Sequence, residues 1–282
     1  MAQTVDSGSI EVGINGRFFP SNWRPARDEI SFASAYGFRA LQFPGKLEGL
    51  HATHLDDELT VVGAQLAEAG IMAVMEIVVR INAAGRAQNG QTPLDVLCAN
   101  LPAITALPCR YVHWHLALSE WPGEPAVRRL EEALAPQFAA AVALAQEHGF
   151  TFGLEHNEPD LALFGNPASC RDILTATPGL GFVWDLNHTT PADLPAYLDL
   201  IPHVRLLHVS DTPLPEVNHH LPLGLGNIDF AAYLRALAQG GFAGPAILEI
   251  GGLPKSGGYG RDTDEALVAS RRQLEGALAM AT

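Results

Sequence analysis

The sequence predicts an α/β fold, a (β/α)8 TIM barrel that forms a single domain over residues 1–282. Short apolar runs alternate with helical stretches eight times, and no break in composition separates the units. The apolar runs are nearly continuous, as they are in parallel strands that are buried on both faces. Eight such units in 282 residues, 48% of them hydrophobic, match the size of one barrel. The alternative is an open doubly wound sheet, but no GxGxxG turn follows the first strand.

Each unit begins with a strand-like run and ends with a helix. Strands are expected at residues 10–15, 39–43, 71–79, 110–116, 150–155, 180–185, 204–209 and 245–250. Helices are expected at residues 27–37, 58–69, 94–106, 126–148, 167–176, 191–200, 229–239 and 263–280. Gly70 and Gly149 follow two of these helices directly, where glycine commonly ends a helix. We expect Pro136 to interrupt the long helical region, because proline lacks the backbone amide that a helix interior needs.

Composition narrows the class of partner. The formal net charge is −14 and the chain has only two lysines, so it would repel nucleic-acid phosphates and anionic membranes. No stretch is long and apolar enough to span a bilayer, and the first residues lack the basic-then-apolar order of a signal peptide. The three cysteines are scattered. We therefore expect a cytoplasmic protein with reduced thiols, acting on a small molecule.

Four successive strands end in polar side chains that suit chemistry. The fifth strand ends in Glu155, the sixth in Asp185, the seventh near His208 and the eighth near Glu249. In such a barrel the carboxyl ends of the strands form the active site. Side chains alternate along a strand, so the bulky neighbours of these residues are expected to face the helices. The four polar side chains would then converge in the mouth of the barrel.

Three carboxylates that converge in a space of low dielectric constant repel one another strongly. A divalent cation resolves this repulsion. Three carboxylates and one imidazole form a hard-leaning ligand set that suits Mn²⁺ best, with Mg²⁺, Co²⁺ and Zn²⁺ as alternatives. Glu155, Asp185, His208 and Glu249 are therefore predicted to be metal ligands.

Several short motifs resemble the xylose-isomerase-like barrel superfamily. They are LEHN (154–157), WDLNH (184–188), HVSD (208–211), HHLPLGLGNIDF (219–230) and LEI (248–250). The superfamily includes ketose 3-epimerases, hydroxypyruvate isomerase, inosose dehydratase, 3-dehydroshikimate dehydratase and endonuclease IV. The resemblance covers nearly the whole chain, implies the same four metal ligands, and implies a homodimer or homotetramer.

The resemblance implies an isomerase or epimerase of a small sugar or sugar-like ketone. In that branch two glutamates, here Glu155 and Glu249, exchange protons with the substrate through a metal-stabilised enediolate. The alternative is a metal-dependent dehydratase of an inosose or dehydroshikimate-type compound, which begins with the same proton abstraction. An endonuclease IV-like nuclease is disfavoured. The second and third strands end without histidine, and Asn218 stands where that motif has aspartate. A metal- or sugar-binding barrel without catalysis is the remaining possibility.

Further side chains are expected to line the mouth and bind substrate. The resemblance places His188 and one basic side chain, either His219 or His220, against the substrate. The substrate-binding candidates are His188, His220, His115, Asn157 and Trp23.

Other polar residues near the mouth have less specific expectations. Asn157 follows Glu155 closely and is expected to orient it. Glu76 and Arg80 are expected to form a salt bridge. The loop after the eighth strand, with Lys255, Gly257 and Gly258, is a weaker candidate anion site.

Overall fold

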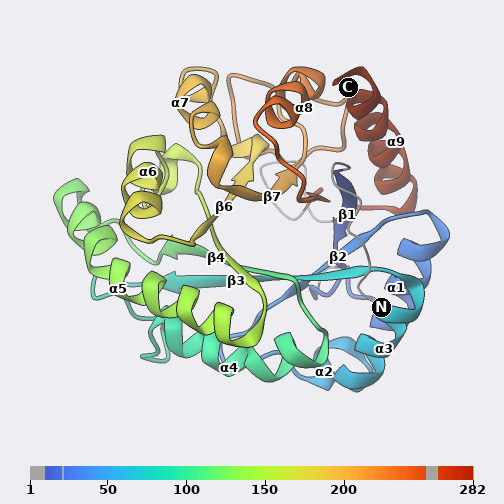
Figure 1. The fold of residues 1–282 in the computed structure, drawn as a ribbon, viewed down its shortest axis with the longest axis horizontal. Helices are drawn as coiled ribbons and strands as arrows, with labels where there is room; N and C mark the ends of the chain where they lie inside the picture. The colour runs from blue at the N-terminus through green and yellow to red at the C-terminus, as the bar shows by residue number, and fades with distance from the viewer. Residues whose placement is uncertain (1–9, 21, 252–259, 282) are drawn as a thin grey trace.

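The computed structural model describes residues 10–20, 22–251 and 260–281. In this part of the chain eight strands form a closed barrel in chain order, and every neighbouring pair is parallel. Helices surround the strands, and the last helix packs near the first strand (Figure 1). The predicted (β/α)8 barrel is confirmed.

The strands lie where the sequence predicts them, within one or two residues at each end. They are β1 (Glu11–Asn15), β2 (Ala40–Pro44), β3 (Met72–Ile81), β4 (Tyr111–Leu118), β5 (Thr151–Glu155), β6 (Gly181–Asp185), β7 (Val204–Val209) and β8 (Pro245–Leu248). The ends of β5 and β6 coincide with the predicted ends. Glu249 lies one residue beyond β8, not inside it.

In the described residues, the remaining regular structure consists of α-helices and three short 3-10 turns. The α-helices are α1 (Ala26–Ala35), α2 (Ala52–Leu55), α3 (Leu59–Ala69), α4 (Pro93–Ala106), α5 (Glu124–His148), α6 (Pro167–Ala176), α7 (Leu194–Leu198), α8 (Phe230–Gln239) and α9 (Asp264–Ala281). Within the described residues, no helix combines the length and the apolar character that a bilayer crossing requires. Cys98, Cys109 and Cys170 are all free, as expected, whereas the compartment remains a prediction.

Two helix predictions were wrong. α5 is continuous through Pro136, because that residue and Glu132 are both exposed. The carbonyl that loses its helical partner therefore faces water, while buried Leu134 and Phe138 hold the helix against the barrel. The helix expected at 191–200 shortens to α7, because Pro195 is tolerated only in its first turn.

The core has an outer and an inner part. The outer part packs the outward-facing strand residues, such as Phe152, Phe182 and Trp184, against the helices. The inner part is a small cluster inside the barrel, formed by Ala40, Val74, Val183, Leu206 and Ile247. The predicted alternation is therefore confirmed for β6 and β8. This inner cluster closes the barrel below the polar residues at the carboxyl ends of the strands.

Candidate metal centre

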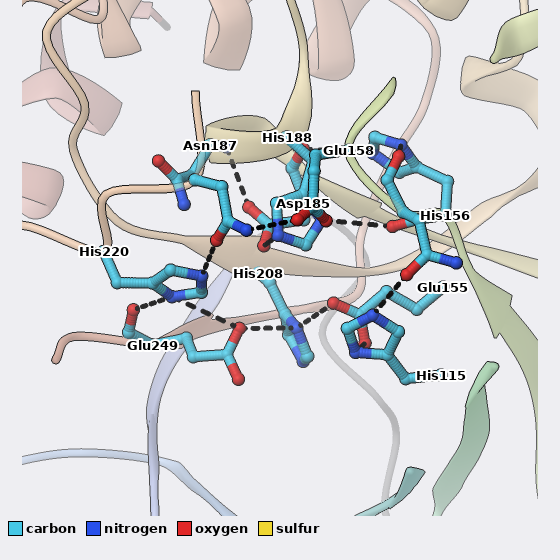
Figure 2. A network of polar contacts seen from close by, with 12 residues as sticks. His115, Glu155, His156, Glu158, Asp185, Asn187, His188, His208, His220 and Glu249 are labelled. Carbon is cyan, nitrogen blue, oxygen red and sulfur yellow. Dashed lines mark hydrogen bonds and ion pairs between the residues drawn. The ribbon is translucent and has the colours of Figure 1, made fainter. Parts of the chain in front are cut away.

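Four side chains meet at the carboxyl ends of the last four strands. Glu155 ends β5, Asp185 ends β6, His208 lies near the end of β7, and Glu249 follows β8. One potential ligand atom from each lies within 4.8 Å of the others. Figure 2 shows Glu155 and Glu249 on either side of His208. The structure thus brings together the four predicted ligands.

The donor set fits a cation. Glu155, Asp185 and His208 are fully buried, and the Glu249 side chain is 16% exposed. Among the described residues, Oε2 of Glu155 and Oδ2 of Asp185 are buried without a hydrogen bond. Buried carboxylate oxygens are costly when they are unpaired. Apart from imidazole contacts at 3.2 to 3.5 Å, the two oxygens are unsatisfied, as the ligand atoms of a cation site would be.

The charges inside the cluster are strongly coupled. Burial opposes the charge of His208, but the carboxylates of Glu155 and Glu249 outweigh this effect and raise the pKa of His208 well above its ordinary value. Nδ1 of His208 lies 2.8 Å from Oε1 of Glu155 and 3.1 Å from Oε2 of Glu249. Burial acts to raise the pKa of Glu249, but His208 outweighs it and lowers that pKa to about 2. One imidazolium thus balances two carboxylates.

Asp185 is the carboxylate left without such a balance. Burial, helped by Glu249 and Glu155, raises the pKa of Asp185 to about 7, although His220 and His208 oppose the shift. Its Oδ1 accepts a hydrogen bond from the backbone of Asn187 at 2.8 Å, which fixes the direction of the carboxylate. Cation binding would therefore compete with protons at this site, so we expect metal affinity to fall at low pH.

His188 and His220 lie beside Asp185 and line the cavity above it. His188 donates from Nδ1 to the carbonyl of His156 at 3.1 Å, and its Nε2 lies 3.2 Å from Oδ2 of Asp185. His220 donates from Nδ1 to the carbonyl of Glu249 at 3.0 Å. By contrast, the imidazole of His219 contacts the exposed carboxylate of Glu216. The structure therefore places His220, not His219, at the cavity.

His115 also lines the cavity, and its partners show that the expected salt bridge between Glu76 and Arg80 does not form in the described residues. Its Nδ1 lies 3.2 Å from Oε1 of Glu76, so Glu76 pairs with His115 and not with Arg80 in the described residues. Its Nε2 lies 2.8 Å from Oδ1 of Asn157. Burial acts to lower the pKa of His115, but Glu155 and Glu76 raise it to about 10.

Two substrate-binding predictions differ from the structure. Asn157 is buried and its amide donates to the carbonyls of Leu116 and Leu163, so it orients His115 and not Glu155. Trp23 is 44% exposed and donates to the carbonyl of His54, outside the described lining of the cavity. The prediction failed because the position of a loop does not fix the direction of a side chain within it. Lys255, Gly257 and Gly258 lie outside the described residues.

The sequence reasoning missed several residues that contact the cluster. Gln42, from β2, accepts a hydrogen bond from His208 at 2.9 Å, and Asn15, from β1, donates to Glu249 at 3.1 Å. His113, from β4, lies 3.3 Å from Oε2 of Glu155. The available signal was a polar residue inside an apolar strand, as in RALQF. Glu158 was also missed, and it lies in the loop after β5.

A cavity of about 460 Å³ opens above the cluster. The polar side chains that line this cavity include those of His115, Glu158, His188, Asn218, His220 and Glu249. This volume suits a small polar molecule, and the lining offers many hydrogen-bonding groups. Glu249 is the one of the four clustered residues that also lines the cavity.

The fold and the cluster define a (β/α)8 barrel with a candidate metal site at the carboxyl ends of its strands. The family described as xylose isomerase-like TIM barrel matches residues 30–272. The chain belongs to this family. No curated protein sequence matches the chain.

Several solved structures share the fold at low sequence identity. An L-ribulose 3-epimerase is 19% identical with a TM-score of 0.76, over 97% of this chain and 96% of the other. The IolI protein with a bound zinc atom is 15% identical with a TM-score of 0.76, over 97% and 99%. The 3-keto-D-glucoside 4-epimerase from E. coli is 15% identical with a TM-score of 0.72, over 95% and 100%.

Proposed function

We propose that this protein is a divalent-metal-dependent isomerase or epimerase of a small sugar or sugar-like ketone. One observation carries the proposal. A buried cluster of three carboxylates, two of them from glutamates, and one imidazole lies directly below a polar cavity. The epimerases among the structural neighbours act on sugars, which supports the substrate class. The oxygen-rich ligand set favours Mn²⁺, with Mg²⁺, Co²⁺ or Zn²⁺ as alternatives.

The proposed ligands are Glu155, Asp185, His208 and Glu249. When bound, a divalent cation would supply positive charge to the substrate oxygen that becomes negative as the neighbouring carbon loses its proton. We assign the proton removal to Glu249, because it lines the cavity. Glu155, on the other side of His208, would return a proton to the opposite face or to a neighbouring atom.

The remaining cavity residues would position the substrate. His188 and His220 are buried, and each ring is fixed by one hydrogen bond to a backbone carbonyl. Nε2 of His188 lies 3.2 Å from Oδ2 of Asp185 and Nε2 of His220 lies 2.8 Å from Oδ1 of Asn218, so a substrate oxygen would share or replace these contacts. The chain has a net charge of −14, and Glu76, Glu158 and Glu249 line the cavity, so we propose an uncharged sugar or sugar-like ketone as substrate and not a nucleic acid.

The proposal is tested by treating the protein with chelator, adding Mn²⁺, and incubating it in D₂O with a panel of ketoses and cyclic keto-polyols. Proton NMR follows exchange of the hydrogen next to the carbonyl. Exchange with a new sugar isomer supports the proposal, and exchange with loss of water supports the dehydratase. The proposal fails when neither occurs although the metal is bound.

A dehydratase is the second candidate, and Glu158 is the observation that favours it. This carboxylate is buried beside the cavity, and its Oε1 accepts a hydrogen bond from Asn218. Among the described residues its Oε2 has no hydrogen-bond partner. A carboxyl group so placed would protonate a departing hydroxyl group. Glu158→Gln should then block loss of water but leave deuterium exchange intact.

We also propose that the protein assembles as a homodimer or homotetramer. Sedimentation equilibrium would test this, and a monomer at micromolar concentration would contradict it.

A further inference from the structure

Gln42 is a buried amide on the inner face of the barrel. It lies on β2, two residues after Ala40, whose side chain belongs to the inner cluster. Side chains two residues apart on a strand face the same side, so Gln42 also points inward. Its side chain is fully buried and bridges two other buried side chains, His208 of β7 and Glu76 of β3.

The bond to Glu76 sets the direction of the amide. Nε2 of Gln42 donates to Oε2 of Glu76 at 3.1 Å. A carboxylate oxygen accepts a hydrogen bond from an amide NH₂ group, so the NH₂ end of Gln42 faces Glu76. The carbonyl end, Oε1, therefore faces His208, 2.9 Å from its Nε2.

The direction of the amide in turn fixes which ring nitrogen of His208 donates to Gln42. Since Oε1 of Gln42 is an acceptor, Nε2 of His208 must carry a hydrogen and donate it. In a neutral imidazole the lone pair then lies on Nδ1. Nδ1 is the atom that faces Oε1 of Glu155 at 2.8 Å and Oε2 of Glu249 at 3.1 Å. Of the two neutral forms of His208, this is the one whose free nitrogen, Nδ1, lies on the same side as the other proposed ligands and could bind a cation together with them.

We propose that Gln42 is a positioning residue that holds His208 in the tautomer and ring orientation that a metal ion requires. The inference rests on the metal centre of the proposed function. Metal-bound histidines in general donate their second ring nitrogen to a fixed acceptor, and loss of that acceptor weakens metal binding. Gln42 supplies such an acceptor without adding charge.

The neutral amide has a specific advantage here. Glu155, Asp185 and Glu249 already bring three carboxylates to the site. A fourth carboxylate in contact with His208 would increase their repulsion. Glu76 instead stands one residue further away, behind Gln42, and its other oxygen lies 3.2 Å from Nδ1 of His115. The amide thus transmits the direction set by Glu76 without bringing the Glu76 carboxylate into contact with His208.

The experiment compares Gln42→Met with the unsubstituted protein, since methionine has similar length and no hydrogen-bonding amide. Gln42→Leu serves as the second variant if the first does not fold. The matched control is Asn100→Leu, because Asn100 is an equally buried amide whose partners are the backbones of Lys46, Leu50 and Val96. Circular dichroism and melting temperature report folding for each variant.

Two measurements are made on chelator-treated protein titrated with Zn²⁺. Isothermal titration calorimetry gives the dissociation constant. Selective ¹⁵N labelling of histidine, followed by NMR, reports which nitrogen of His208 carries the hydrogen. We expect Gln42→Met to weaken Zn²⁺ binding by about 10- to 100-fold. We also expect it to abolish the slowly exchanging Nε2 hydrogen, while Asn100→Leu changes neither quantity.

The outcomes separate the two proposals. If the unsubstituted protein binds no divalent metal, the proposed function fails, and this inference fails with it. If it binds metal but the folded Gln42→Met variant binds equally well, only the inference fails. A purely structural role for Gln42 predicts a lower melting temperature with an unchanged dissociation constant, and that result would also overturn it.

Discussion

Replacing Asp185 with asparagine should stabilise the metal-free protein and remove its response to metal. Oδ2 of Asp185 is buried without a hydrogen bond in the described structure, 3.2 Å from Nε2 of His188. Nδ1 of His188 donates to the carbonyl of His156, which leaves Nε2 facing Asp185. Asp185→Asn would keep a side chain of the same size beside Nε2 and would remove the buried negative charge.

The size of the effect follows from the pKa. Burial, Glu249 and Glu155 raise the pKa of Asp185 from 3.8 to about 7. A shift of this size corresponds to about 4 kcal/mol. The free energy of unfolding falls by this amount when Asp185 is ionised in the folded protein. For a raised carboxyl pKa this loss is absent below pH 3.8, grows as the pH rises, and is complete above pH 7. The gain from Asp185→Asn should therefore be larger at pH 8 than at pH 5.

The assay is chemical denaturation of chelator-treated protein at pH 5 and pH 8, with and without Mn²⁺. At 100 times the dissociation constant, Mn²⁺ should stabilise the unsubstituted protein by about 2.7 kcal/mol, and Asp185→Asn should lose most of this response. Asp172→Asn is the matched control, because Asp172 is an exposed carboxylate paired with Arg128. Its effect should stay within about 0.5 kcal/mol. Destabilisation of the metal-free protein by Asp185→Asn at pH 8 would refute the reasoning.

Three further predictions follow from individual contacts. Glu249→Gln should retain the fold but lower kcat by about 100-fold or more, because the proposed base is lost; normal turnover in the D₂O assay would contradict its role. His220→Ala should lower kcat/KM at least tenfold, whereas His219→Ala should not, since only His220 lines the cavity; equal effects would argue against this placement. Thr92→Ala should destabilise the protein by about 1 kcal/mol with unchanged metal affinity, because Thr92 and Asp95 form the capping box of α4. Denaturation and calorimetry check the last prediction.

The sequence predicted the barrel well because each strand is buried on both faces and each carries its own apolar signal. Helix limits were harder to predict. Pro136 acts as a helix breaker in isolation, but tertiary packing of Leu134 and Phe138 overrides it in α5. Conversely, α7 is shorter than its pattern suggests, because Pro195 fixes where it begins.

The four clustered side chains were predictable because strand ends are local features. Gln42 was not, since its importance comes from His208, a residue of β7 that is far away in sequence. β2 and β7 are not neighbours in the barrel, so only closure of the barrel brings the two side chains together. Trp23 illustrates the opposite case, because an aromatic residue in a nearby loop pointed elsewhere.

The contacts divide the barrel into two halves with different roles. The four proposed ligands come from β5 to β8 or directly follow them, and three of them contact side chains from β1 to β4, whereas Asp185 is held by Asn187 and His188, which follow β6. Asn15 donates to Glu249, Gln42 accepts from His208, and His113 lies 3.3 Å from Glu155. Each of these contacts crosses from the first half of the chain to the second. Substitutions in the first four strands should therefore change metal affinity without removing a ligand, and the geometry of the centre should depend on closure of the whole barrel.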